Sequence, residues 1–354
     1  MPDSFVNADP HALTLTVKSR TLEWQWALYV LWRRRELTMA YTLFHRDCLD
    51  WLAAEPENSV EAIVTDPPYG LKEYTHKEKT KLRNGNIGGV WRIPPKLDGS
   101  ERSPLPRFTV LTREDLSVLT EFFTAWGMAT RRIAVPGAHL FIATNPFLSD
   151  LLYAALRAAG WEKRGEVVRL VQTLKGGDRP KNAEEEFSDV TVMPRSAWEP
   201  WGIFRKPLDG RVQDNLRRWK TGGLRRVSAS RPFTDVIASE RTPKREREIA
   251  NHPSLKPQRF MREIVYSVLP LGSGRVLDPF MGGGSTIAAA EAVGYESIGI
   301  ELDEQYFCVA EQAIPRLTTL YGKARSAFSF EYSVDAIEEE ELEPISVSMQ
   351  PSLL

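Results

Sequence analysis

The chain has 354 residues, of which 42% are hydrophobic and 26% are charged, and its formal net charge is −1. This composition is ordinary for one large globular domain or two smaller ones, and the net charge alone gives no sign of a polyanionic partner. Only two cysteines are present, Cys48 and Cys308, which excludes a disulfide framework or a Cys-x-x-Cys metal site. The five histidines show no metal-ligand spacing, so we expect no metal.

Charge is unevenly distributed along the chain. Residues 205–247 contain 13 Lys or Arg against 5 Asp or Glu, whereas residues 331–354 contain 7 acids and no base. The negative charge of the acidic end therefore offsets that of a basic interior segment, so the net charge of the chain is close to zero. Because the acidic end also has few core-forming residues, we expect 326–354 to be a disordered tail.

Residues 1–38 are expected to be a poorly ordered extension, with Met39 as an alternative start of the native protein. The apolar cluster at 24–32 is shorter than the about 20 residues that span a bilayer. Three arginines follow this cluster, whereas the charges of a signal peptide precede its apolar stretch. We therefore expect no membrane anchor and a cytoplasmic protein.

Strand-like and helical patterns alternate from residue 41 onward. Apolar spacing predicts strands at 41–44, 60–65 and 138–144, and helices at 48–54, 116–133 and 148–159. Residues 70–112 are basic, rich in Gly and Pro and without periodicity, so we expect a mobile loop there. Together these elements form the first, catalytic half of one domain, at 39–160.

Residues 161–250 begin like a strand and then become polar, basic and rich in Trp, which favours an inserted region. The alternation resumes at 251–325, the second, cofactor-binding half, with helices expected at 257–269, 285–293 and 304–320 and strands at 275–277 and 297–300. Strands separated by helices predict an α/β fold with a mainly parallel sheet covered on both faces.

The first candidate site is the end of the buried strand 60–65, where the chain continues as Asp66-Pro67-Pro68-Tyr69. Ligands bind at the carboxyl ends of parallel strands. Two prolines remove two N–H donors, which leaves the Asp66 carboxylate and the Pro67 carbonyl as acceptors beside the flat ring of Tyr69. Two acceptors on the N–H bonds of a base amino group would localise its lone pair, and the carboxylate would favour the charge that develops on nitrogen. The base would have to be flipped out of the duplex and could stack on the ring.

The second candidate site is a glycine-rich turn between a strand and a helix. It contains Asp278, Pro279, Phe280, Gly282, Gly284, Ser285 and Thr286. Glycines allow close approach of a ligand to the backbone, and the start of a helix offers free N–H groups. Glu301 ends the next strand, where an acid can accept hydrogen bonds from both hydroxyls of a ribose. The order strand, turn, helix, strand, acid predicts a nucleoside cofactor, although the glycine pattern differs from that of a nicotinamide dehydrogenase.

Together these motifs resemble the amino-directed DNA methyltransferases, which modify N6 of adenine or N4 of cytosine. Asp66 to Tyr69 resembles their catalytic motif, and Asp278 to Gly284 resembles their S-adenosylmethionine motif. Residues 252–257, His-Pro-Ser-Leu-Lys-Pro, resemble the motif that precedes the cofactor strand. The catalytic motif comes first, which is the order of the beta class, with target-recognition sequence in between. On this basis 161–250 is expected to be the target-recognition region.

The resemblance implies a Rossmann-like, seven-stranded methyltransferase sheet, S-adenosylmethionine as cofactor and double-stranded DNA as partner. It implies that Glu301 binds the cofactor ribose, that Asp47 and Cys48 contact the cofactor adenine, and that Lys256 with Ser285 or Thr286 lies near the methionine part. It also implies a bacterial or phage-type, nucleoid-associated enzyme of restriction-modification type, and leaves a homodimer open. An Asp in first place of the catalytic motif is more typical of adenine enzymes and a Ser of cytosine enzymes, so N6 of adenine is favoured over N4 of cytosine.

The basic segment between the two motifs is the expected DNA contact, because Lys and Arg neutralise phosphates and Arg can read guanine edges. The residues predicted to bind DNA are Arg217, Arg218, Lys220, Arg225, Arg226 and Arg231. Three more distant alternatives stay open: an RNA substrate, a protein amide substrate, and a catalytically silent DNA-binding homologue. Neither cysteine lies in a Pro-Cys motif, which argues against methylation at cytosine C5.

Overall fold

The structure is a computed structural model that describes residues 40–69, 111–171, 180, 182–192, 194 and 196–322. The predictions made for the extension 1–38, for the tail 326–354 and for all but the last two residues of the loop 70–112 lie outside the described residues.

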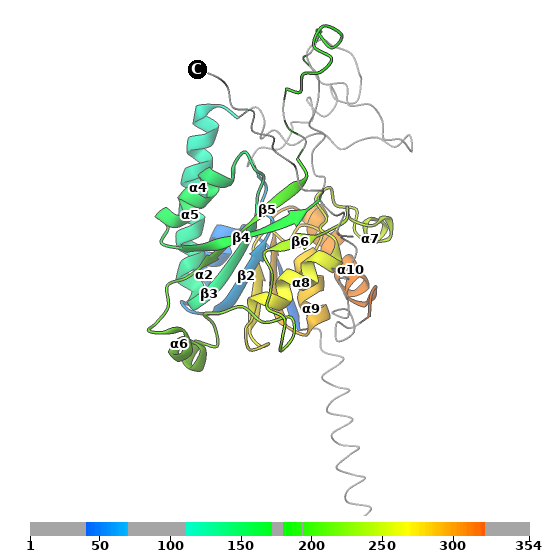
Figure 1. Cartoon of the computed structure of the whole chain (residues 1–354). Coiled ribbons are helices and arrows are strands. Elements are labelled where there is room, and N and C mark those ends of the chain that lie inside the picture. Colours follow the sequence, from blue (N-terminus) through cyan, green and yellow to red (C-terminus); the bar gives the residue numbers. More distant parts are fainter. Residues whose placement is uncertain are drawn as a thin grey trace, which may run out of the picture.

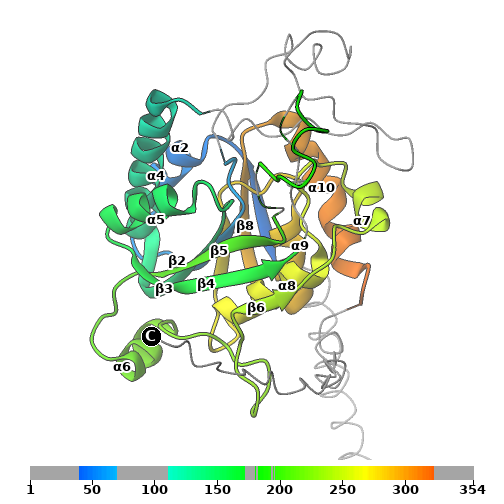
Figure 2. The same ribbon diagram turned by 45° about the horizontal axis from the view of Figure 1, so that its top comes forward.

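Eight strands of the described chain form one sheet, in the order β1-β8-β7-β2-β3-β5-β4-β6 (Figures 1 and 2). Every neighbouring pair is parallel except the two pairs that β5 makes with β3 and β4. The strands are β1 Tyr41–His45, β2 Val60–Thr65, β3 Ala134–Ala143, β4 Glu162–Leu170, β5 Trp198–Arg205, β6 Val236–Ala238, β7 Arg275–Asp278 and β8 Glu296–Glu301. The mainly parallel α/β fold is thus confirmed, with eight strands in place of the seven expected because the short β6 adds an edge strand.

Helices cover both faces of the sheet (Figure 1). One face carries α2 Cys48–Ala54, α4 Arg113–Ile133 and α5 Ser149–Ala158. The other face carries α8 Gln258–Val268 and α9 Ser285–Val293, and α10 Glu304–Thr319 packs against α9. Two short helices lie outside these layers: α6 Val212–Trp219, which contacts β3, and α7 Lys244–Ile249, which lies beside α10 (Figure 1).

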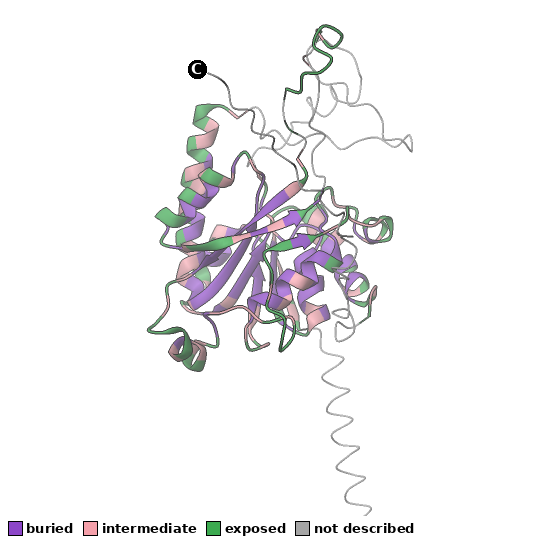
Figure 3. Cartoon of the chain, in the orientation of Figure 1, coloured by how far each residue is buried: buried purple, intermediate pink, exposed green. Residues whose placement is uncertain are grey.

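Successive side chains of the central strands point alternately into two hydrophobic cores, one on each face of the sheet. In β2, Ile63 joins the core under α4 and α5, whereas Ala62 and Val64 join the core under α8 and α9. Neighbouring strands alternate in the same way, because successive side chains of a strand point to opposite faces. Leu140 and Phe141 of β3 show this division. The central strands β2 and β3 are therefore buried on both faces (Figure 3), which explains why they read as nearly continuous apolar runs, whereas the outer strands β1 and β4 have exposed residues.

The segment 161–250 is not separate from the sheet. Its β4 and β5 extend the sheet beyond β3, and β6 pairs with β4 (Figure 2). The boundary expected at residue 160 therefore does not coincide with an edge of the sheet. The physical reason is that β5 pairs with β3 in antiparallel register and buries Trp201 and Phe204 in the two cores. The role of this segment in target recognition stays a prediction.

Candidate active site

The site lies where the sheet changes its direction of winding. From β2 the chain continues to β3 on one side, and from β7 it continues to β8 on the other side, so β2 and β7 are neighbours at the switch point. In open parallel sheets, ligands bind outside the carboxyl ends of the strands at such a point. Both motifs predicted from the sequence lie here, because Asp66 follows β2 and the glycine-rich turn follows β7.

A buried hydrogen bond joins the ends of these two strands. The Thr65 hydroxyl donates to Asp278 Oδ1 at 2.7 Å, and the backbone N–H of Phe280 donates to the same oxygen at 3.1 Å. Asp278 is only 2% exposed. Burial raises the pKa of Asp278 to about 7, although hydrogen bonds from Thr286 and Thr65 favour its charged form. Asp278 thus ties the catalytic strand to the cofactor turn.

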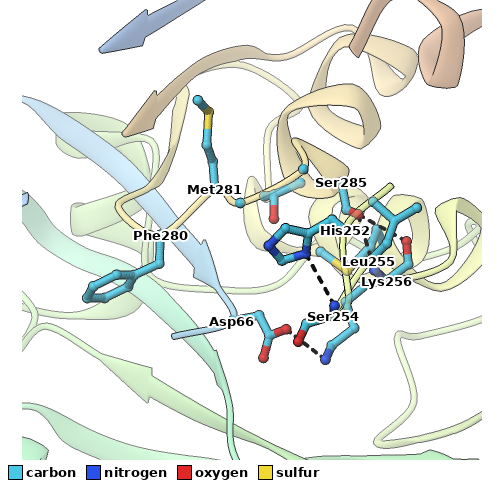
Figure 4. A pocket seen from close by; sticks show the side chains of 12 residues that line it. Asp66, His252, Ser254, Leu255, Lys256, Phe280, Met281 and Ser285 are labelled. Carbon is cyan, nitrogen blue, oxygen red and sulfur yellow. Dashed lines mark hydrogen bonds and ion pairs between the residues drawn. The ribbon is translucent and has the colours of Figure 1, made fainter. Parts of the chain in front are cut away.

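Asp66 is the centre of a network of charged side chains, and Figure 4 shows its ion pair with Lys256. The Tyr69 hydroxyl donates to Asp66 Oδ1 at 2.9 Å, and the Lys256 ammonium lies 2.7 Å from Asp66 Oδ2. Lys256 Nζ also lies 3.0 Å from Glu199 Oε1, and the Tyr69 hydroxyl lies 3.2 Å from the same oxygen. Arg169 Nη1 completes the network 2.8 Å from Glu199 Oε2. Two acids and two bases therefore form one connected network.

The two carboxylates of this network differ in their preference for a proton. Burial raises the pKa of Asp66 above its ordinary value, and Lys256 opposes this shift without cancelling it. Burial would raise the pKa of Glu199 as well, but the charges of Lys256 and Arg169 lower it to about 2. Burial disfavours the charged form of Lys256, yet Asp66 and Glu199 outweigh burial and raise its pKa. The negative charge is thus held more firmly on Glu199 than on Asp66.

The glycine-rich turn approaches its neighbours too closely for side chains. Gly282 and Gly284 have φ of 50° and 84°, in the left-handed region that favours glycine. A Cβ on Gly282 would lie 2.9 Å from the ring of His252. Gly284 is also the N-cap of α9. Because glycine has no side chain to cap the helix, the first N–H groups of α9 face the turn without a hydrogen bond from a capping side chain.

Glu301 closes the other side of the turn, at the end of β8. Its Oε2 accepts a hydrogen bond from the N–H of Gly282 at 2.9 Å, and its Oε1 accepts one from the N–H of Asp303 at 2.9 Å. A carboxylate has about four acceptor positions, so one hydrogen bond on each oxygen leaves capacity for ribose hydroxyls. The free acceptor positions of Glu301 and the close backbone of the glycine-rich turn therefore fit the nucleoside part of S-adenosylmethionine.

The predicted adenine contacts lie next to Glu301. β1 pairs with β8 in register His45 to Glu301, and the N–H of Arg46 donates to the Glu301 carbonyl at 3.0 Å. Asp47 caps α2 by accepting hydrogen bonds from two backbone N–H groups of its first turn. Cys48 is buried, and burial raises the pKa of its thiol to about 12. The structure thus brings Asp47 and Cys48 close to Glu301, and their contact with the cofactor adenine stays a prediction.

Lys256 lies beside Ser285, and its predicted place near the methionine part of the cofactor stays a prediction. Its backbone makes the contact with the helix, because its N–H donates to Ser285 Oγ at 3.2 Å and its carbonyl accepts from the same hydroxyl at 3.1 Å. Its side chain points instead to Asp66 (Figure 4).

A pocket of about 310 Å³, including its open mouth, lies between the two motifs. Its wall contains the first residue of the catalytic motif together with the glycine-rich turn and the 252–256 segment (Figure 4). The lining residues are Asp66, His252, Ser254, Leu255, Lys256, Met261, Phe280, Met281, Gly282, Gly283, Ser285 and Thr286. Motifs that are about 210 residues apart in sequence, Asp66 and Asp278, are therefore joined in one site.

The residues predicted to bind DNA lie away from this pocket. On α6, Asn215 Nδ2 donates to the carbonyl of Pro136, which lies near the beginning of β3. Because β3 is parallel to β2 and Asp66 follows the end of β2, α6 lies at the opposite end of the strands from Asp66 (Figure 1). Arg217 and Arg218 are exposed and form ion pairs with Asp214 and Asp209.

The remaining predicted DNA contacts lie toward the same end of the strands. Lys220 Nζ donates to the carbonyl of Arg217. Arg225 stacks on Tyr266 and donates to the hydroxyl of Tyr295, which fits a structural role. Arg226 bonds to backbone carbonyls of its own loop, and Arg231 lies near Glu263 of α8. The prediction that these side chains contact DNA stays a prediction, and the structure does not bring them together with Asp66.

Three residues of the site were not identified from the sequence. Thr65 is the last residue of β2, and Arg169 and Glu199 are register partners on the antiparallel strands β4 and β5. One signal was available for Glu199: it is an acid in a strand of otherwise mostly apolar residues, and it is only 6% exposed. A buried acid needs a partner, which is a reason to look for a cation nearby.

Comparison with known proteins identifies the family. The family model N6_N4_Mtase, described as DNA methylase, matches residues 60–312. The chain belongs to this DNA methylase family. The family depends on S-adenosylmethionine.

Two relatives are named as Type II methyltransferases. M2.DpnII of Streptococcus pneumoniae is 28% identical over 274 residues, which cover 77% of this chain and 88% of the relative. M.XycI of Xanthomonas campestris pv. cyanopsidis is 24% identical over 298 residues, which cover 76% and 86%. Among solved structures, the PvuII DNA methyltransferase, described as cytosine-N4-specific, is similar in fold with a TM-score of 0.51 and 13% identity, over 80% of this chain and 92% of that one.

No described helix is long and apolar enough to cross a membrane. Within the same residues, no group of three or more His, Cys, Asp or Glu is arranged to hold a metal ion.

The buried Asp278 predicts a specific dependence of stability on pH. Its pKa is about 7 in the fold and 3.8 in the unfolded chain, so the folded protein retains a proton that the unfolded chain releases between these values. Stability is therefore lost as pH rises from about 4 to 7. Asp278→Asn removes this loss, so its free energy of unfolding, relative to wild type, should rise by about 2–4 kcal/mol across that window in denaturant titrations.

The exposed Asp209, which pairs with Arg218, provides the control. Asp209→Asn should show no such rise. Parallel curves of stability against pH for Asp278→Asn and wild type would show that Asp278 does not carry a raised pKa.

Proposed function

We propose that the chain transfers a methyl group from S-adenosylmethionine to the exocyclic amino group of a DNA base flipped out of the duplex, with N6 of adenine as the target. The observation that carries this proposal is the shared pocket, in which Asp66 and the glycine-rich turn line the same wall. When bound, S-adenosylmethionine supplies a methyl group on a positively charged sulfur. Glu301 and the backbone of the turn would hold its nucleoside part.

Asp66 supplies the chemistry that an amino group needs. The lone pair of a base amino nitrogen is delocalised into the ring, so the nitrogen is a poor nucleophile. A hydrogen bond from this amino group to the Asp66 carboxylate, with a second to the Pro67 carbonyl, favours a localised lone pair. Bound S-adenosylmethionine would supply the methyl group and keep the electron pair of the carbon–sulfur bond on sulfur, so that the amino nitrogen would become positive. The nitrogen then releases a proton, which the raised pKa of Asp66 suits it to accept.

Tyr69 would hold the flipped base. Its hydroxyl is anchored on Asp66 and Glu199, so the plane of its ring is set relative to the carboxylate that receives the amino group. Stacking of a base on an aromatic ring contributes about 1–3 kcal/mol. Pro68, which is exposed beside the ring, and Pro67, which is buried, fix the backbone of this turn.

Adenine is favoured by the Asp in first place of the catalytic motif, and N4 of cytosine is the alternative within the same chemistry. A DNA substrate would bring the protein to the bacterial nucleoid. The duplex would approach the edge of the sheet that carries Asp66. The basic segment reaches that edge at α7, because Glu246 of α7 accepts from the N–H of Gln258, whose side chain donates to the Ser285 carbonyl.

Asp66→Ala should reduce methyl transfer to DNA by at least about 100-fold, because it removes the acceptor that activates the amino group. The dissociation constant for S-adenosylmethionine should change little, since Glu301 and the glycine-rich turn are untouched. Transfer of labelled methyl groups to unmethylated bacterial DNA and calorimetric cofactor binding measure the two effects. The exposed Asp214 gives the control Asp214→Ala, which should retain activity. Full transfer by Asp66→Ala would refute the assigned role.

Replacement of Tyr69 should separate its ring from its hydroxyl. Tyr69→Ala removes stacking and should raise the Michaelis constant for DNA by about 5- to 100-fold, which corresponds to 1–3 kcal/mol. Tyr69→Phe keeps the ring and should leave that constant within about threefold of wild type. Steady-state kinetics with varied DNA compare the two variants, and equal constants would exclude base stacking on this ring.

A further inference from the structure

Both oxygens of Asp66 have a partner within the protein. Tyr69 donates to one oxygen, and the Lys256 ammonium lies 2.7 Å from the other. If the proposed function holds, a target amino group must share this carboxylate with the lysine. An adjacent ammonium also neutralises the charge that would favour a positive nitrogen. Withdrawal of Lys256 would therefore restore the negative charge with which Asp66 favours a positive nitrogen.

Glu199 offers Lys256 and Tyr69 a second partner. Its Oε1 lies 3.0 Å from the Lys256 ammonium and 3.2 Å from the Tyr69 hydroxyl. The ammonium has three donors, whereas the hydroxyl has a single proton and donates to one carboxylate at a time. Both side chains can thus keep a charged partner at Glu199 after they leave Asp66.

Glu199 is itself held in place from the opposite side. Its Oε2 accepts from Arg169 Nη1 at 2.8 Å and from Trp201 Nε1 at 3.1 Å. Arg169 in turn donates to Ser239 Oγ and to the Glu240 carbonyl. Arg169 also lies 4.9 Å above the ring of Phe260. The carboxylate is therefore a fixed anchor, because Arg169 and Trp201 are buried and Arg169 is itself bonded to the 239–240 segment.

We propose that Glu199 is a positioning residue, which draws Lys256 and Tyr69 away from Asp66 so that Asp66 can accept the target amino group. Glu199 touches neither the base nor the cofactor in this arrangement and acts through Lys256. This inference rests on the proposed function.

The test is a pair of substitutions at Glu199 and Lys256. In Glu199→Gln, Asp66 remains as the anionic partner of Lys256 within the described part of the chain, so the ammonium stays on Asp66 and competes with the amino group. Single-turnover transfer to unmethylated bacterial DNA, at saturating labelled S-adenosylmethionine and pH 7.5, should slow by about 10- to 100-fold. Glu199 is one of the two charges that raise the pKa of Lys256, so its removal lets burial and Arg169 lower this pKa, and the rate should recover with rising pH as the ammonium loses its proton.

A variant that lacks the Lys256 ammonium distinguishes a positioning role of Glu199 from a general structural role. In Lys256→Gln the ammonium is absent, so adding Glu199→Gln should change the single-turnover rate by less than about threefold. Equal slowing by Glu199→Gln in both backgrounds, or a pH profile parallel to wild type, would overturn the inference.

A matched control comes from the same pair of strands. Glu162 and Arg205 are register partners on β4 and β5 and form an ion pair of 2.7 Å, at the end of these strands farther from Asp66. Glu162→Gln should leave rate and pH profile near wild type. Identical behaviour of Glu162→Gln and Glu199→Gln would also overturn the inference.

Two further outcomes are separable. If Glu199→Gln does not fold, Glu199→Asp, which keeps the charge, is measured instead. A rate between those of wild type and Asp66→Ala, with a partly shifted pH profile, would support the inference. An unshifted pH profile would overturn it. If wild type transfers no label to DNA, the proposed function fails, and with it the inference. If wild type is active, only the inference is at stake.

Discussion

The hydrogen bond between Thr65 and Asp278 marks the constraint on which the site depends, namely that β2 and β7 are neighbours in the sheet. Their carboxyl ends meet at one edge, so the residues that follow them share a pocket although they are distant in sequence. Because both strands are buried on both faces, a shift in their register would expose apolar side chains of the two cores. The packing of the sheet therefore holds the catalytic and cofactor motifs at a fixed separation.

A second constraint is electrostatic. Asp66, Glu199, Lys256 and Arg169 form a buried network of two acids and two bases. Removal of one member would leave an uncompensated buried charge, which costs about 3–5 kcal/mol in comparable cases. The network thus keeps the pocket close to neutral before an uncharged base enters. It also explains why Lys256 points to Asp66, since no other anion lies as close to its ammonium among the contacts of the described residues.

Much of the fold and of the site could be predicted from local patterns. The strand at 60–65 and the helix at 285–293 coincide with β2 and α9, because apolar runs and turn residues are local signals. Glu199 and Arg169 could not be paired in advance, since the antiparallel register of β4 and β5 depends on tertiary packing. The position of α6 at the far end of the strands likewise follows from the path of the chain after β5, which composition does not encode.

Sequencing the genome of a methylation-free bacterium that expresses the chain tests the central claim most directly. The account predicts N6-methyladenine at every copy of one short sequence, and its absence when Asp66→Ala is expressed. N4-methylcytosine in its place would retain the pocket chemistry and change the base. An unmodified genome in cells that contain folded protein able to bind S-adenosylmethionine would contradict the account.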